Sequence, residues 1–286
     1  IILPPNILSL IGIFFKKKST KLIIDIIDIW PEAFPAKNLF IKSIIFVPGL
    51  FSKLIRKIVI ELSDYCITES NFFYKKLNLK LKINSSVIHL KKFQKIKSKN
   101  SQITESFSIA YLGNIGNIYD FNSLFTILQR VGKSRLCHLH IIGDGPRKKW
   151  FFSNLKKMNI HFTYHGASYD ENFKFEILSS CWFGYNGYLD KTEVALSYKS
   201  IDYLSFGLPL INSAKHDSEK LVNKYHIGYN FSENNLEHLI EKLIIIERND
   251  VDSLKKNALK AFEELFSGNS LFNDMDNILE KVKQID

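Results

Sequence analysis

Short runs of β-branched and aromatic residues alternate with helix-like segments along most of this chain, and that alternation restricts its fold more than any other feature. Near-continuous apolar runs such as LIIDII and LHLHII are typical of strands buried on both faces. Strands that are separated by helices form parallel sheets covered on both sides. We therefore predict an α/β protein, with strands at 21–27, 64–68, 86–90, 107–112, 136–142, 160–164, 182–185 and 208–212.

Helical patterns fill the intervals and the C-terminal end of the chain. The predicted helices are 120–131, 146–158, 171–179, 197–206, 236–246, 251–265 and 271–282. Ser232 and Asp250 are predicted as N-caps of the helices near 236 and 251, because both side chains accept hydrogen bonds from helix amides.

A polar segment without periodicity, KKFQKIKSKNSQITES at 91–106, divides the chain. A length of 286 residues is sufficient for two ordinary domains. We predict one α/β unit at 1–97, a second at 98–265, and a C-terminal helix at 266–286 that packs back on the first unit.

The charge is unevenly distributed between the two parts. Residues 1–100 carry 18 Lys and Arg against 6 Asp and Glu, whereas residues 101–286 carry 21 against 23. A basic surface attracts phosphates or an anionic membrane, although a lysine-rich surface can also be merely solvated. No nucleic-acid-binding motif accompanies these charges. The three cysteines are widely spaced, which excludes a disulfide scaffold and fits a reducing compartment.

No convincing membrane span is present. Residues 1–15 are apolar but contain Pro4 and Pro5, and they are shorter than the roughly 20 residues that a span requires. The stretch 39–62 is predicted to form two amphipathic helices separated at Pro48 and Gly49. Its aromatic residues Phe40, Phe46 and Phe51 lie beside Lys and Arg, which suits a membrane interface or, alternatively, a helix pair facing the core.

Two glycine-containing turns follow predicted strands. YLGNIGNIYD places Gly113 and Gly116 after one strand, and IIGDGP places Gly143 and Gly145 after the next. Backbone amides in such turns can face an anion, and a following helix adds partial positive charge. Each turn alone is equally compatible with an ordinary strand-to-helix connection.

A third segment, SYKSIDYLSFGLPLI, is the most informative. Its helix ends at Gly207, and Lys199 and Asp202 share one helical face because they are three residues apart. A lysine there can neutralise a diphosphate and an aspartate can accept two ribose hydroxyls. The same spacing also describes a surface pair.

The order of these segments resembles the nucleotide-sugar-binding domain of GT-B glycosyltransferases, and glycosyltransferase family 4 in particular. The similar segments are FSIAYLGNIGNIYDFNSLF, LHIIGDGPRKKW, HFTYHGASYDENF, CWFGYNGY and YKSIDYLSFGLPLIN. Upstream, KLIIDIIDIWPEAF resembles a "D..D.WPE" segment of members that build bacterial surface polysaccharides such as capsule and exopolysaccharide, and DYCITESNFFYKKL resembles the strand and helix that follow it.

The resemblance implies a GT-B fold of two Rossmann-like domains, with an incomplete acceptor-side domain at 1–97 and the donor-binding domain at 98–265. It implies transfer of a sugar, with retention of configuration, from a nucleotide-sugar, with UDP-sugar expected, onto a lipid-linked polysaccharide or oligosaccharide. No cofactor and no metal are expected. The enzyme is expected in the cytoplasm, peripheral at the inner face of the cell membrane and in contact with anionic lipid, and no nucleic acid is expected as a partner.

The resemblance also assigns residues to the donor. Asp202 matches the second acidic residue of the family's E-x7-E motif, which binds ribose, and Lys199 matches a phosphate-facing lysine with a catalytic role. The loops around the diphosphate and base are matched by Gly113, Asn114, Gly116, Gly143, Asp144, Gly145, His165 and Gly166.

Three features depart from the family pattern. Val194 occupies the position of the first acidic residue of the motif, with Glu193 beside it, and Asn114 and Asn117 stand in the loop where Arg and Lys are usual. The first strands of the N-terminal domain also have no counterpart, so a truncated chain is expected.

On the acceptor side, Asp28 or Glu32 is expected to orient or deprotonate the acceptor hydroxyl, although capping and solvation explain these residues equally well. His138 and His140 alternate on one strand, but no third metal ligand is visible. Two further functions stay open: a GT-B sugar-nucleotide epimerase, which needs no acceptor, and a non-catalytic subunit that binds donor or partner.

Overall fold

A computed structural model describes residues 1–32, 39–81, 84–93 and 104–285. The chain divides into two compact units, and each is treated by itself. Unit 1 comprises residues 1–91 and 268–286, and unit 2 comprises residues 92–267. Much of the predicted linker at 91–106 lies outside the described residues.

Unit 1 is built on a four-stranded parallel sheet with the strand order β1-β2-β3-β4. Its strands are β1 (Ile2–Leu3), β2 (Ile23–Ile26), β3 (Tyr65–Thr68) and β4 (Ser85–Val87). Its helices are α1 (Asn6–Phe15), α2 (Leu39–Leu62), α3 (Asn71–Lys76), the 3-10 turns η1 (Leu79–Leu81) and η3 (Gly268–Ser270), and α11 (Leu271–Lys283). The sequence analysis missed β1, which is only two residues long.

Helix α2 corrects the prediction of two helices at 39–62. It is one helix of 24 residues that continues past Pro48. Beyond the proline, Ile55 and Val59 are four residues apart and both enter the core against β2 and β3. This packing favours helix up to Leu62, although a proline removes one backbone hydrogen bond. On the same sheet, Ile278 and Val282 of α11 pack with Tyr65 and Ile67 of β3.

Unit 2 contains a six-stranded parallel sheet with the order β10-β9-β8-β5-β6-β7. The strands are β5 (Phe107–Leu112), β6 (Cys137–Ile142), β7 (Phe162–Tyr164), β8 (Phe183–Asn186), β9 (Leu210–Asn212) and β10 (Gly228–Asn230). The helices are α4 (Phe121–Val131), α5 (Lys148–Lys157), α6 (Glu171–Leu178), α7 (Tyr198–Ser205), α8 (Asp217–Tyr225), the 3-10 turn η2 (Glu233–Asn235), α9 (Leu236–Ile245) and α10 (Arg248–Leu265). All the strands predicted for this unit form, and α8 and β10 are additions.

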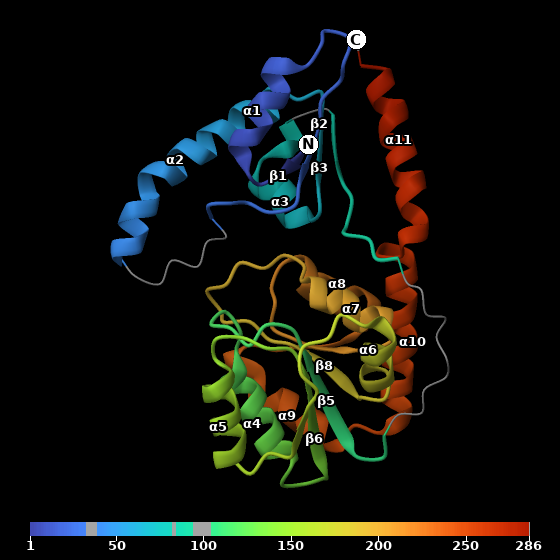
Figure 1. The fold of residues 1–286 in the computed structure, drawn as a ribbon. Helices are drawn as coiled ribbons and strands as arrows, with labels where there is room; N and C mark the ends of the chain where they lie inside the picture. Colours follow the sequence, from blue (N-terminus) through green and yellow to red (C-terminus); the bar gives the residue numbers. More distant parts are fainter. Residues whose placement is uncertain (33–38, 82–83, 94–103, 286) are drawn as a thin grey trace. The chain divides into compact units, whose positions relative to one another are not determined.

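Helices cover both faces of this sheet. Figure 1 shows α4, α5 and α9 together on one face and α7, α8 and α10 together on the other. The central strands β5, β8 and β9 are buried at every residue, whereas the edge strands β7 and β10 are only partly buried. Apolar positions three and four residues apart on α4 face the sheet, and Asp120 caps that helix by accepting from the Ser123 amide at 3.1 Å.

Two predicted N-caps are wrong. Ser232 caps the short turn η2 rather than α9, which begins after Asn235. Helix α10 begins at Arg248 with Glu247 as its N-cap. Asp250 lies three residues later and its side chain accepts from the Glu247 amide at 3.2 Å, so it is the second member of a capping box.

Candidate functional site

The strand order of unit 2 reverses between β5 and β8. Counted along the chain from β5, the order across the sheet is 3-2-1-4-5-6. In an open parallel sheet the chain leaves β5 and β8 toward opposite sides, which opens a crevice at their carboxyl ends. The loops that follow β5 and β8 are therefore the expected position of a ligand site.

These two loops are joined by backbone hydrogen bonds. The Leu189 amide donates to the Ile118 carbonyl at 3.0 Å, and the Asp120 amide donates to the Gly187 carbonyl at 3.3 Å. Tyr119 and Tyr188 form an antiparallel bridge between the same loops. The two connections thus form one joined structure at the switch point.

The glycine turns after β5, β6 and β7 also lie edge to edge. The Gly113 amide donates to Ile142 at 2.9 Å, the Ile115 amide to Asp144 at 2.8 Å and the Gly143 amide to Gly166 at 2.8 Å. The sequence-predicted loop residues Gly113, Asn114, Gly116, Gly143, Asp144, Gly145, His165 and Gly166 are therefore brought together along the carboxyl edge of three adjacent strands. The amides of Gly113, Ile115 and Gly116 already donate hydrogen bonds within the protein. They are therefore not free to bind an anion, in contrast to the expectation for backbone amides in such turns.

Close backbone approach explains the glycines of the second turn. A Cβ atom on Gly143, where φ is +154°, would lie 1.9 Å from the Gly113 carbonyl oxygen. A Cβ atom on Gly145 would lie 2.6 Å from the Ile115 backbone. These positions need glycine because the neighbouring loop occupies the space of a side chain.

Lys199 reaches this edge from the first turn of α7. The helix is capped by Ser197, whose hydroxyl accepts from the Ser200 amide at 3.2 Å. The Lys199 stem passes under the glycine loop, since a Cβ atom on Gly113 would lie 4.0 Å from its Cδ atom. The side chain is buried, with 8% of the residue exposed.

The Lys199 ammonium group lies in a cage of three tyrosines. Its Nζ atom is 4.1 Å from the ring centre of Tyr119, 4.5 Å from that of Tyr188 and 5.1 Å from that of Tyr111. Within the described part of the chain, this Nζ atom has no hydrogen-bond partner. Burial lowers the pKa of Lys199 well below its usual value. A buried amine without a hydrogen-bond partner is the feature of this edge most suited to receive an anion, because an anion beside it would favour the protonated form.

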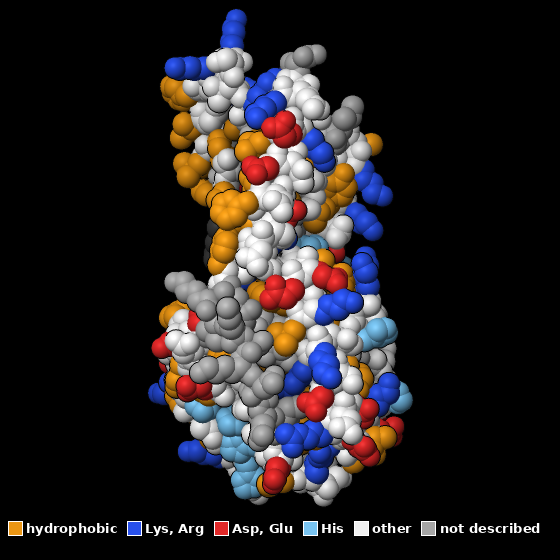
Figure 2. Space-filling view, turned by 90° about the vertical axis from the view of Figure 1, so that its right-hand side faces the viewer, with side chains coloured by type: hydrophobic (Ala, Val, Ile, Leu, Met, Phe, Trp, Pro, Cys, Tyr) orange, Lys and Arg blue, Asp and Glu red, His pale blue; other side chains and the backbone are white. Residues whose placement is uncertain are grey.

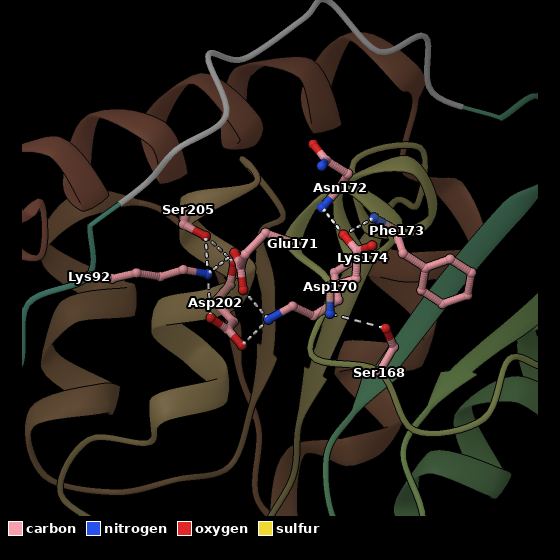
Figure 3. Close-up of polar contacts among 9 residues, drawn as sticks. All are labelled: Lys92, Ser168, Asp170, Glu171, Asn172, Phe173, Lys174, Asp202 and Ser205. Atoms are coloured by element: carbon pink, nitrogen blue, oxygen red, sulfur yellow. Dashed lines mark hydrogen bonds and ion pairs between the residues drawn. The ribbon is translucent and has the colours of Figure 1, made fainter.

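Asp202, one turn further along α7, lies in a different environment (Figure 3). Its two carboxylate oxygens accept from Lys92 at 2.5 Å and from Lys174 at 3.3 Å. Glu171 pairs with both lysines, at 2.8 Å from Lys92. Burial alone would lower the pKa of Lys174, but Glu171 and Asp202 outweigh burial and raise it. Lys199 and Asp202 are thus neighbours on one helix with different partners.

The departures from the family pattern are visible at this edge. Val194 is half-buried and Glu193 is exposed in the segment that precedes α7. Asn114 and Asn117 are exposed in the glycine loop. Exposed Asp144, in the turn after β6, pairs at 3.0 Å with Lys148, the first residue of α5. Lys199 is the buried basic side chain that lies against this loop.

Three histidines lie together: His138 and His140 are within β6, and His165 directly follows β7. His140 Nδ1 lies 3.1 Å from His165 Nε2, and the His138 and His140 ring centres are 4.7 Å apart. Burial and the neighbouring histidines lower the pKa of His140 to about 4. A third histidine, His165, which the sequence analysis placed only in a base-binding loop, therefore completes this group. Across the described ranges, no set of three or more His, Cys, Asp or Glu side chains is arranged to hold a metal ion.

Unit 1 has its own polar edge at the carboxyl ends of β2 and β3. Glu69 follows β3, and burial together with the charges of Asp25 and Asp28 raises its pKa to about 8. Asp28 accepts from the Ile29 amide at 2.7 Å. Glu32, the other predicted acceptor-side residue, receives two hydrogen bonds from Arg56 at 2.6 and 3.0 Å.

The Arg56 pair changes the chemistry of Glu32. Burial by itself would raise the pKa of Glu32, but the hydrogen bonds and charge of Arg56, with Lys53, lower it overall. A carboxylate held in this way is a weak base, so Glu69, whose pKa is raised, is better suited to accept a proton than Glu32.

Sequence reasoning missed four residues of these clusters: Glu69, Lys92, Glu171 and Lys174. Glu69 immediately follows a predicted strand, as Gly113 does, and this position at a strand end could have marked it as a candidate site residue. Lys92 lies in the polar segment that was interpreted as a linker, and nothing local distinguishes it. Glu171 and Lys174 begin a helix as an ordinary i,i+3 pair.

A surface of exposed apolar side chains covers much of α1 and α2. Ten apolar residues expose more than half of their surface to solvent. They are Ile7, Leu8, Ile11, Phe14 and Phe15 on α1 and Phe46, Val47, Leu50, Phe51 and Leu54 on α2. We call these ten residues the apolar face. Figure 2 shows hydrophobic side chains in a row on the surface of unit 1, with Lys and Arg near one end. None of the helices that the structure describes has the length and hydropathy of a membrane span.

Solved glycosyltransferase structures share this fold. HepE (Alr3699) of Anabaena with UDP-glucose gives a TM-score of 0.69 at 12% identity, over 98% of this chain and 78% of that chain. Sucrose-phosphate synthase of Thermosynechococcus elongatus gives 0.70 at 11% identity, over 96% and 71%. S. aureus TarM, in a complex containing UDP, gives 0.69 at 11% identity, over 94% and 53%.

The chain spans about half the length of the TarM structures. No protein-family model matches the chain, and no curated protein matches its sequence. At identities this low the likeness establishes the arrangement of strands and helices. The chain therefore has the α/β fold of the GT-B glycosyltransferases, with two parallel sheets covered by helices.

Proposed function

We propose that this chain is a glycosyltransferase that moves a sugar from a nucleotide-sugar donor to a glycan acceptor. One observation carries the proposal: a buried lysine without a hydrogen-bond partner lies against the glycine loop at the switch point of a Rossmann-like sheet. Parallel sheets of this kind bind nucleotides at that point. A diphosphate would supply the counter-ion that Lys199 lacks.

The chemistry follows from this placement. In the transfer, the bond between the sugar C1 and the donor phosphate breaks, the bond between C1 and the acceptor oxygen forms, and the acceptor proton passes to a base or the leaving diphosphate. Negative charge develops on the diphosphate as it leaves, and a fixed cation in a water-poor site stabilises that charge. Lys199 fills this role, and the tyrosine cage has to open to admit the diphosphate.

The donor is proposed to be a UDP-sugar, and Asp202 to accept the ribose hydroxyls. HepE and TarM, whose fold the chain shares, were determined in complexes that contain UDP-glucose or UDP. The loops at Gly143 and His165 would face the base. Membership of glycosyltransferase family 4, retention of configuration and the absence of metal remain parts of the proposal that rest on the sequence resemblance.

On the acceptor side, Asp28 is proposed to orient the attacking hydroxyl, with Glu69 as the group that takes its proton. A base works best when its pKa is near the working pH, and the pKa of Glu69 is about 8. The acceptor is proposed to be lipid-linked and the enzyme peripheral to an anionic membrane. Membrane docking needs hydrophobic and electrostatic attraction. The apolar face supplies the first, and the exposed Lys17, Lys18 and Lys53 supply the second.

Donor binding by the full chain tests the proposal directly. UDP-, GDP- and dTDP-sugars are added to the wild type and to Lys199→Met and Asp202→Asn, and the melting temperature is recorded. A ligand that binds only the folded state raises that temperature. Lys133→Met is the matched control, because Lys133 is exposed between α4 and β6, at the opposite edge of the sheet from the glycine loop.

We expect one nucleotide class to stabilise the wild type and the control, and neither site variant. Release of the nucleoside diphosphate in the presence of an acceptor extract then measures transfer. Stabilisation by a sugar nucleotide that is converted without acceptor would indicate an epimerase instead. A cooperative melt that no nucleotide shifts would contradict the proposal.

A further inference from the structure

Four alternating charges form a closed ring around Asp202. Lys92 lies between Asp202 and Glu171, at 2.5 and 2.8 Å, and Lys174 lies between the same two carboxylates. Figure 3 shows the side chains of Lys92 and Lys174 approaching Asp202 from two sides. The ring contains two cations and two anions, so its charges offset one another.

Three of the four side chains in this ring are almost fully buried. The exposed fractions are 6% for Lys92, 7% for Lys174 and 8% for Asp202, against 33% for Glu171. Lys92 also donates to Ser205 Oγ at 3.2 Å and lies 4.6 Å from the Phe206 ring centre. Buried charges of this kind persist only with good geometry, which fixes the orientation of the Asp202 carboxylate.

Lys92 comes from outside the α/β repeat that carries Asp202. It is the first residue of unit 2 and is separated from Asp202 by 110 positions. Its backbone is held where the chain leaves the unit, because its amide donates to the Phe266 carbonyl at 2.7 Å and it bridges Ser267. Lys92, where the chain passes from unit 1 into unit 2, thus fixes the orientation of the Asp202 carboxylate on α7.

The ring leaves Asp202 able to accept more hydrogen bonds. Each carboxylate oxygen carries two lone-pair sites, and each accepts from one lysine. The remaining two sites match the two hydroxyls of a ribose. The ammonium groups hold the plane of the carboxylate and thus the direction of those sites.

We infer that Lys92 and Lys174 are positioning residues that aim the Asp202 carboxylate at the 2′- and 3′-hydroxyls of the donor ribose. This inference rests on the proposed function. It adds that ribose recognition by unit 2 depends on a lysine delivered by the segment that enters the unit. Neither lysine touches the reacting atoms.

The ratio of the affinities for a ribonucleotide and its 2′-deoxy analogue tests this inference. If the two lysines only stabilised the fold, their replacement would leave that ratio unchanged. The affinities of the full chain for UDP and 2′-deoxy-UDP are measured by calorimetry, and GDP and dGDP are used where the uridine pair does not bind. We expect the wild type to prefer the ribonucleotide at least tenfold, or about 1.4 kcal/mol. In Lys92→Met and Lys174→Met the preference should fall below about threefold, through weaker ribonucleotide binding.

Three controls accompany these variants. Lys92→Arg and Lys174→Arg keep a cation and should retain most of the preference, and Lys133→Met should retain all of it. Where Lys92→Met does not fold, Lys92→Met with Glu171→Gln keeps the ring neutral and preserves the Lys174–Asp202 pair, so the measurement can still be made.

Each outcome decides one question. Folded lysine-to-methionine variants that bind UDP with the wild-type preference would overturn the inference and leave the proposed function intact. Equal binding of UDP and 2′-deoxy-UDP by the wild type would also overturn it, because Asp202 would then not contact the ribose. A wild type that binds no nucleotide of either pair overturns the proposed function itself.

Discussion

The Nζ atom of Lys199 lies 4.1 Å from the centre of the Tyr119 ring, on a loop that a backbone bridge ties to Tyr188. The cage favours a cation through the faces of its rings but gives it no hydrogen bond. The free protein therefore bears the cost of a buried amine that becomes useful when an anion arrives. Stability and binding should consequently respond in opposite directions to changes at this position.

Replacement of Lys199 by methionine should stabilise the free protein and weaken donor binding. Methionine fills a similar volume without a buried polar group, so the free energy of unfolding should rise by about 1–3 kcal/mol. Donor affinity should fall about tenfold or more, since a charged hydrogen bond to the diphosphate is lost. Denaturant unfolding and calorimetry measure the two effects. A variant that is less stable and still binds donor would show that the lysine has a structural role.

Replacement of Gly143 by alanine should disrupt the glycine loops. The new Cβ atom would overlap the Gly113 carbonyl oxygen at 1.9 Å, and neither backbone can move without breaking the joined edge. The free energy of unfolding should fall by at least about 3 kcal/mol. Gly116→Ala is the matched control, because its Cβ atom would meet only the Asn114 side chain at 3.1 Å. Equal denaturation midpoints for the two variants would contradict this account.

Unit 2 should lose stability in mild acid because of His140. The pKa of His140 is lowered by burial and by His138 and His165 to about 4, from a usual value near 6.5. Between these values the unfolded chain binds a proton that the folded chain does not, so stability present above pH 6.5 is lost as the pH falls toward 4. His140→Gln should flatten the dependence, whereas exposed His238→Gln should not. Unfolding curves at half-unit pH intervals provide the test.

Glu69 should give unit 1 the opposite dependence. Its pKa is raised to about 8 by burial and by the charges of Asp25 and Asp28. Between about 4.5 and 8 the folded chain binds the additional proton, so the stability that protonated Glu69 contributes is lost as the pH rises through 8. Glu69→Gln resembles the protonated form and should be more stable than the wild type at pH 8.5. Exposed Glu61→Gln, the control, should leave the profile unchanged, and an unchanged Glu69→Gln profile would refute the assignment.

The apolar face should bind anionic membranes. Phe14 and Phe15 are 77% and 82% exposed, so their replacement by serine should not affect folding. Burial of a phenylalanine is worth about 1.5–3 kcal/mol, and the double variant should lose more than tenfold in partitioning. Co-sedimentation with phosphatidylcholine vesicles containing phosphatidylglycerol measures this, with Leu136→Ser as the control. Binding should weaken in 0.5 M salt, because Lys17 and Lys18 attract the headgroups.

Absence of wild-type binding to those vesicles, or equal binding to vesicles of phosphatidylcholine alone, would contradict membrane docking. Neither result bears on donor binding, which is measured without lipid.

The sequence by itself determined the α/β class, the predicted strands and helices of unit 2, and the positions of the glycine turns. These properties are local, since side-chain burial repeats every two or about four residues and glycine directly follows β5 and β6, at Gly113 and Gly143. The same local signals failed at β1 and β10, which are two and three residues long. They also failed at Pro48, where packing of Ile55 and Val59 favours a continuous helix.

Only the tertiary structure decided what each candidate side chain faces. Lys199 and Asp202 are three residues apart, yet one enters a tyrosine cage and the other a ring of charges whose key member, Lys92, lies 110 positions away. His165 meets His140 across 25 positions, and Glu69 acquires its raised pKa from burial and from the charges of Asp25 on β2 and Asp28 just after β2. Electrostatic environment depends on distance in space and on burial, and a local sequence pattern records neither.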